Sequence, residues 1–198
     1  MQNKNNIKGF TLVELLIVLT VVGTLAAAAV FIINPEELLK QTRDATRVND
    51  LGNINRAISI FLSQSISGDL NGTANDGDCI NRHYTNIQPA GYVNSFSAGR
   101  ALPQIDSDRK PDGTGWIPID FTQTLVGVSP LSVLPIDSEN TGELVYRYAC
   151  NMTNGVREYE LNAKLESIKY TSDTQFDRDG KDGGDKADFY EIGSALNL

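Results

Sequence analysis

A single carboxylate, Glu14, lies near the start of an otherwise apolar stretch that runs from Phe10 to Ile33. At about 1.5 Å per residue, a helix of this length spans the roughly 30 Å hydrocarbon core of a bilayer. A carboxylate inside such a helix costs about 2.5–3.5 kcal/mol on insertion scales. We therefore interpret Glu14 as a functional residue that has a partner. The alternative is a carboxylate that reaches water at the membrane edge.

A short polar leader precedes the apolar stretch. Residues 1–9 contain Lys4 and Lys8 and no acidic residue. Positive charges beside a membrane helix keep that end of the chain in the cytoplasm. A secretory signal peptide is the competing interpretation, with the alanines at 26–29 as a cleavage site. The apolar run is longer than a signal peptide needs, and Glu14 would lie inside it.

The residues Gly9-Phe10-Thr11-Leu12-Val13-Glu14 resemble the processing motif of type IV pilins and of the pseudopilins of type II secretion systems. The resemblance implies that prepilin peptidase cuts between Gly9 and Phe10 and then methylates the new amine of Phe10. It also implies assembly from the membrane lipid into a helical filament of identical and related pilin subunits, by an inner-membrane assembly machinery. In such a filament Glu14 would face the amine of a neighbour's Phe10, and breaking a buried ion pair of this kind typically costs about 3–5 kcal/mol.

The chain as a whole is acidic. It has 17 Lys and Arg against 25 Asp and Glu, a net charge of -8, and loss of Lys4 and Lys8 with the leader makes it more acidic. An acidic surface argues against general nucleic-acid binding, which needs basic residues to replace counterions. About 160 residues follow the membrane segment, which is enough for one soluble domain.

Helical periodicity continues beyond Asn34-Pro35, where we expect a kink, to about Gln64. Apolar residues recur at three-, four- and seven-residue spacings, and the pattern places charged residues on the other faces of this helix: Lys40, Arg43, Asp44, Arg47, Asp50 and Arg56. Residues 65–135 are rich in Gly, Asn, Asp, Ser and Pro. They are typical of a variable loop region, with at most an edge strand at 113–119.

The C-terminal third has the alternation of β-strands. Residues 144–150 and 156–165 predict a hairpin, and 188–192 predict a last strand. The expected fold class is α+β. A long N-terminal helix, transmembrane over 10–33 and amphipathic over 35–64, would pack on a small antiparallel sheet at 143–198 within one globular domain, 34–198.

Cys79 and Cys150 are the only cysteines. The expected topology places both outside the cytoplasm, where disulfides persist, so we favour a bond over two free thiols. Such a bond closes a loop of about 70 residues, which a chain-entropy argument rates at about 4 kcal/mol. Two cysteines and the single His83 make a poor zinc site.

An aspartate-rich, glycine-rich segment occupies 173–188. Carboxylates at this density repel one another unless they are solvated or bridged by a cation, and hard oxygen ligands suit calcium. The candidate Ca²⁺ ligands are Asp177, Asp179, Asp182 and Asp185. The segment departs from the EF-hand pattern, because Lys181 stands at the third ligand position. The arrangement resembles that of the major pseudopilins of type II secretion systems, and this resemblance implies that the segment binds calcium. The alternative is an acidic loop that is solvated and binds no ion.

Two classes of function follow from these features. The first is a structural filament subunit, which is a single-pass membrane protein with a cytoplasmic N-terminus before processing and part of an extracytoplasmic filament afterwards. It includes secretion pseudopilins and the pilins of adhesion or DNA-uptake pili. The second is a membrane-anchored binding protein of the cell surface, which has no need of Glu14. We expect no enzyme, since His83 stands alone and no nucleophile or phosphate-binding motif surrounds it.

Overall fold

The computed structural model describes residues 9–65, 67–72, 79, 82–96, 100, 102–172 and 175–198. The predicted leader, residues 1–8, lies outside the described residues. The chain divides into two compact units, Met1–Leu39 and Lys40–Leu198, and each is considered by itself.

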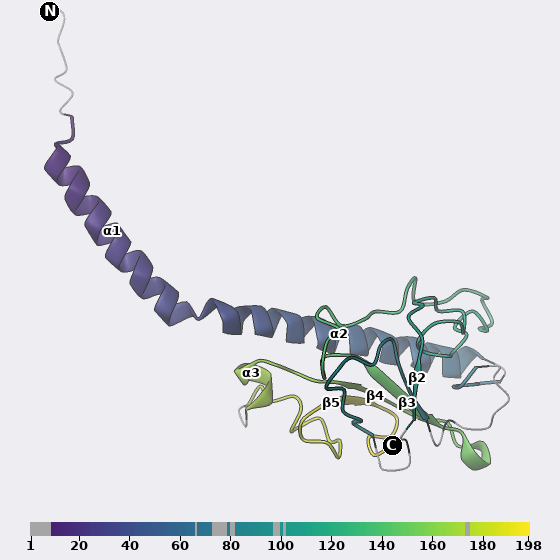
Figure 1. Ribbon diagram of the computed structural model, residues 1–198. Coiled ribbons are helices and arrows are strands. Elements are labelled where there is room, and N and C mark those ends of the chain that lie inside the picture. The colour runs from purple at the N-terminus through teal and green to yellow at the C-terminus, as the bar shows by residue number, and fades with distance from the viewer. Residues whose placement is uncertain are drawn as a thin grey trace, which may run out of the picture. The chain divides into compact units, whose positions relative to one another are not determined.

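The first unit contains helix α1, Leu12–Ile33 (Figure 1). Among the described residues, one helix is long and apolar enough to cross a membrane. It covers Leu12–Val30, and none of it is buried. The helix ends at Asn34, whose φ of 44° lies in the left-handed region. Pro35 follows and cannot continue the hydrogen-bond ladder of α1, so the kink predicted at Asn34-Pro35 is confirmed.

Helix α2, Pro35–Gln64, starts at that proline, which suits the first position of a helix because its missing N–H would be unpaired there. It ends at Gln64, as the helical spacing of apolar residues predicts. Its buried apolar residues are Leu51, Ile54, Ala57, Ile58 and Phe61. This face forms one core cluster with side chains from the sheet.

The sheet has five strands in the order β2-β1-β3-β4-β5. Strands β1 and β2 are parallel, and the other neighbours are antiparallel. The α+β fold class predicted from the sequence is therefore confirmed. The elements of this unit after α2 are β1 (Arg82–Thr85), β2 (Leu102–Ile105), β3 (Arg147–Asn151), a 3₁₀ turn (Thr153–Gly155), β4 (Glu158–Ala163), α3 (Ile168–Thr171) and β5 (Tyr190–Gly193).

The middle region contributes more to the domain than a variable loop would. Strands β1 and β2 both belong to it, and its side chains in the core cluster are Leu70, Cys79, Trp116, Ile117, Ile119, Phe121 and Leu134. The edge strand expected at 113–119 is absent from this described stretch, which makes only an isolated bridge between Asp112 and Asp120. A turn at Gly113 explains the difference, because its φ of 85° lies in the left-handed region and not in the extended region that a strand requires.

The two faces of the sheet differ in polarity. The face against α2 carries Tyr148, Cys150, Leu161 and Ala163, as the alternation predicts. The other face is also buried, but its side chains are mostly polar. It includes His83, Thr85, Arg147, Glu160, Asn162 and Glu191. His83 is a lone histidine in a polar part of the sequence, for which we expect a surface position; that expectation is wrong, because the strand Arg82–Thr85 places it on this buried face.

Candidate functional site

The N-terminal site begins with two exposed residues, Gly9 and Phe10, that precede the first helical residue. Phe10 is 86 % exposed. The peptide bond between them therefore lies outside α1, in a part of the chain that a peptidase can reach without unwinding the helix.

Thr11 and Glu14 form a reciprocal cap at the start of α1. The Thr11 backbone N–H and its hydroxyl both donate to Oε2 of Glu14, at 2.8 Å each. The Glu14 backbone N–H donates back to Oγ1 of Thr11 at 3.2 Å. This arrangement satisfies orphan donors of the first turn. The sequence reasoning missed this partner, although a threonine three residues before a glutamate is the signal for it.

The cap leaves one carboxylate oxygen of Glu14 available. Both bonds from Thr11 end on Oε2, and Oε1 accepts no hydrogen bond from the described residues. The carboxylate is thus fixed in orientation by its own chain and still has room for a second donor.

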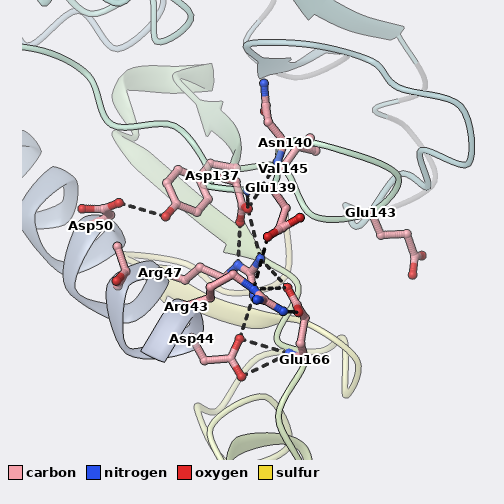
Figure 2. A network of polar contacts seen from close by, with 12 residues as sticks. Arg43, Asp44, Arg47, Asp50, Asp137, Glu139, Asn140, Glu143, Val145 and Glu166 are labelled. Atoms are coloured by element: carbon pink, nitrogen blue, oxygen red, sulfur yellow. Dashed lines mark hydrogen bonds and ion pairs between the residues drawn. The ribbon is translucent and has the colours of Figure 1, made fainter. Parts of the chain in front are cut away.

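A buried network of ion pairs joins α2 to loop segments of the second unit (Figure 2). The Arg47 guanidinium binds Asp137 at 2.5 and 3.0 Å, Asp44 at 2.8 Å and Glu166 at 2.6 Å. Asp44 in turn accepts the backbone N–H groups of Glu166 and Ser167, at 3.0 and 2.8 Å. The prediction that Asp44 and Arg47 lie on outer faces of the helix is wrong, since both are fully buried.

The network compensates the cost of burying charge. Burial disfavours the charged form of Arg47, but hydrogen bonds and charge from Asp137 and the other carboxylates outweigh it and raise the pKa of Arg47. Burial likewise opposes ionisation of Glu166, yet Arg43 and Arg47 lower its pKa below the usual value. These groups make a structural anchor rather than a reactive centre, because each charged side chain contacts at least one group of opposite charge.

The predicted disulfide between Cys79 and Cys150 is present. Cys150 lies in β3, and Cys79 belongs to the middle region. Arg100 reinforces the same place, because its guanidinium donates to the backbone carbonyls of Cys79 and Cys150. The bond thereby ties the middle of the chain to a central strand.

The four candidate calcium ligands do not form a ready-made set. Asp177 accepts the Gly180 N–H at 3.0 Å, Asp182 accepts the N–H groups of Gly184 and Glu191 at 2.9 and 2.6 Å, and Asp185 pairs with Lys186 at 2.9 Å. Burial and the neighbouring Asp177 raise the pKa of Asp179 to about 6. Within the described residues, no three His, Cys, Asp or Glu side chains are arranged to hold a metal. Calcium binding by these aspartates stays a prediction.

Comparison with known proteins identifies the N-terminal segment. A family model described as the prokaryotic N-terminal methylation motif matches residues 4–30. No match was found among curated proteins or solved structures. The matched residues include residues 4–9 of the leader, the Gly9-Phe10 bond and Glu14. The match, which covers 27 of the 198 residues, indicates a prepilin-type N-terminus like that of type IV pilins, and with the apolar helix α1 it supports a membrane-anchored N-terminus.

Proposed function

We propose that this chain is a structural subunit of a type IV pilus-like or type II secretion pseudopilus filament, assembled through α1. The observation that carries the proposal is the methylation motif, with Glu14 at the fifth position counted from Phe10. A helix that is apolar on all sides, apart from one oriented carboxylate, suits a membrane first and a helical bundle afterwards.

The cap at Thr11 suggests how processing and assembly are ordered. Before cleavage, the nitrogen of Phe10 belongs to a neutral peptide bond and cannot pair with a carboxylate as a cation. Cleavage turns it into an amine that is positively charged at neutral pH. The unengaged Oε1 of Glu14 would then accept the amine of a neighbouring subunit, while Thr11 holds Oε2. Assembly through this pair is therefore available only to processed subunits.

The type of filament is the finer part of the proposal. The acidic C-terminal segment supports a major pseudopilin. The long middle region, which supplies β1, β2 and part of the core cluster, is larger than a compact pseudopilin requires. A subunit of an adhesion or DNA-uptake pilus, and a membrane-anchored binding protein, are the alternatives. Neighbouring genes for a secretin, an assembly ATPase or DNA-uptake proteins would separate them.

Replacing Glu14 tests the proposal. In cells that carry the filament machinery, Glu14→Ala should leave the amount of subunit in the membrane unchanged, because removing a carboxylate does not hinder insertion. The yield of sheared filaments should fall at least tenfold. Thr20→Ala is a matched control in the same helix, since the Thr20 hydroxyl donates to the carbonyl oxygen of Leu16 in its own helix. Normal filament yield from Glu14→Ala would contradict an assembly role.

A further inference from the structure

The chain contains two Asn-Gly pairs that the filament role does not use, Asn71-Gly72 and Asn154-Gly155. In such a pair the asparagine amide is open to attack by the backbone nitrogen that follows it, because glycine has no side chain to block the approach. The reacting groups of the two pairs are identical. A difference in their reactivity in the folded protein therefore reports on the structure around each pair.

The second pair lies at the tip of the loop between β3 and β4, in the 3₁₀ turn described above. Both of its residues have positive φ, 55° for Asn154 and 81° for Gly155. The Val156 N–H donates to the Thr153 carbonyl oxygen at 3.1 Å across the turn. Positive φ at both central residues is the geometry of a type I′ turn, in which Asn-Gly is a preferred pair. The four residues of the tip are exposed, so water reaches the Asn154 amide.

The tip can rotate without disturbing packed residues. The Asn154 side chain makes no hydrogen bond within the described residues, and a Cβ built on Gly155 would meet no atom within 4 Å. The base of the loop is held instead, because the Asn151 amide donates to Glu158 at 2.9 Å and accepts the Thr153 N–H at 3.1 Å. Rotation of the peptide between Asn154 and Gly155 is therefore confined to the tip.

The first pair is packed against another segment. Asn71 and Gly72 are half-buried, and the Asn71 backbone N–H donates to Oδ1 of Asp69 at 3.0 Å. A Cβ built on Gly72 would lie 2.5 Å from the Pro118 carbonyl oxygen, which shows how close the two backbones are. Bringing the Gly72 nitrogen onto the Asn71 amide requires a rotation that this packing opposes. Losing one hydrogen bond and this packing slows the reaction by about tenfold or more.

We propose that Asn154 is a site of spontaneous covalent modification, at which the asparagine is deamidated to aspartate and isoaspartate. The Gly155 nitrogen attacks Cγ of Asn154, the Cγ–Nδ2 bond breaks, and ammonia leaves with the proton of the Gly155 N–H. The product is a succinimide ring. Water then opens the ring at one of its two carbonyl carbons, and attack at the main-chain carbon gives isoaspartate. In total, an amide and water become a carboxylate and ammonium, with no oxidation or reduction.

The modification changes the surface of the subunit in two ways. Each conversion adds one negative charge to an exposed turn of a chain whose net charge is already -8. Isoaspartate also routes the main chain through the former side chain of Asn154, which lengthens the backbone by one methylene and removes the geometry of the turn. An older subunit therefore differs covalently from a newly made one at this tip.

The test follows deamidation in the full chain in detergent. Folded protein and protein denatured with guanidinium are incubated in the same mildly alkaline buffer, then reduced and digested with trypsin. The digest separates the two pairs, because the enzyme cuts after Arg56, Arg82, Arg147 and Arg157. Tandem mass spectrometry of the folded sample should show a gain of about 1 Da at Asn154 at least about tenfold faster than at Asn71. In the denatured sample the two rates should be similar.

Asn154→Gln is the matched control, because it keeps an amide but would have to form a larger ring, and it should stay unmodified. Equal rates at Asn71 and Asn154 in the folded protein would overturn the proposal. So would an intact Asn154 in folded protein after the denatured chain has been converted. These measurements use unassembled subunits, so either outcome leaves the filament proposal standing, and a failure of the filament test leaves this one standing.

Discussion

His83 shows how the pKa of a titratable residue changes on the buried polar face of the sheet. Its Nδ1 lies 2.8 Å from the Arg100 carbonyl oxygen, and its ring stacks on Tyr92 with a centroid distance of 5.7 Å. Burial lowers the pKa of His83 to about 4, and the charges of Arg147 and Arg100 act in the same direction. The imidazole is consequently neutral in the folded protein at physiological pH.

Stability should therefore depend on pH through His83. The unfolded residue titrates near pH 6.5, so between pH 6.5 and 4 the unfolded chain binds a proton that the folded chain does not. The free energy of unfolding should fall by about 2–3 kcal/mol between pH 7.5 and 4.5 from this residue alone. Denaturant titrations of the wild type and His83→Gln at both pH values isolate the effect. Glu191, whose pKa is raised to about 8, makes the free energy of unfolding change with pH in the opposite direction, but it is present in both proteins and its contribution cancels. Equal pH dependence in the two proteins would contradict it.

Sequence reasoning at this scale succeeded for residues whose role is local. Gly9, Phe10 and Glu14 stand within six positions, and their spacing carries the motif. It failed for Asp44 and Arg47, because the partners that justify their burial, Asp137 and Glu166, lie about 90 and 120 positions further along the chain. No helical pattern contains that information.

At the scale of elements, two features attach residues 40–64 of α2 to the rest of the second unit: the apolar face of the helix and the network around Arg47. Arg47 reaches carboxylates from α2 itself, from the segment before β3 and from the segment after β4. The hydroxyl of Tyr146 adds a bond of 2.9 Å to Asp50, one turn along the helix. These contacts fix the rotation of α2 about its axis more narrowly than apolar packing would.

Removing Arg47 should be costly. Arg47→Met keeps most of the side-chain volume but leaves Asp44 and Asp137 as buried charges without a counterion. We expect a loss of about 3–5 kcal/mol in the free energy of unfolding, measured by denaturant titration. Arg43→Met removes a half-buried arginine that binds the same Glu166, and it should cost less than about 1 kcal/mol. Similar losses from both variants would show that the network does not depend on Arg47.

The elements that the sequence predicts are those in which apolar residues recur regularly over many positions, or in which Pro, Gly or Asn ends the element. The end of α2 at Gln64, the break at Asn34 and the three C-terminal strands all follow from periodicity and from turn residues. Strands β1 and β2 were not predicted. Strand β2 contains Pro103, which ordinarily argues against a strand, and β1 has the mostly polar sequence Arg82-His83-Tyr84-Thr85. Strand β1 also pairs with β3, more than 60 positions further along the chain, and no local pattern contains that information.

At the scale of the whole molecule, the Cys79–Cys150 bond connects the middle region to the centre of the sheet across a sequence separation of 71. Its main effect is expected on the unfolded chain, which the bond restricts. Because the middle region also supplies Trp116 and Phe121 to the core, loosening it would weaken packing under α2.

Loss of this disulfide should lower the free energy of unfolding by about 2–5 kcal/mol. The comparison is between the oxidised wild type, the reduced wild type and the Cys79→Ala/Cys150→Ala variant. The last two should unfold at similar denaturant concentrations, both below the oxidised protein. Indifference of the wild type to reductant would show that the bond does not constrain the unfolded state.

The central claim is that the chain is a prepilin whose processed helix builds a filament. The most direct test is the chemical identity of the N-terminus in protein extracted from membranes of cells that contain the peptidase. Intact mass and N-terminal peptide analysis should show a chain that begins at Phe10 and carries one methyl group on its amine. A chain that still begins at Met1, or one cleaved within residues 26–29, would contradict the account.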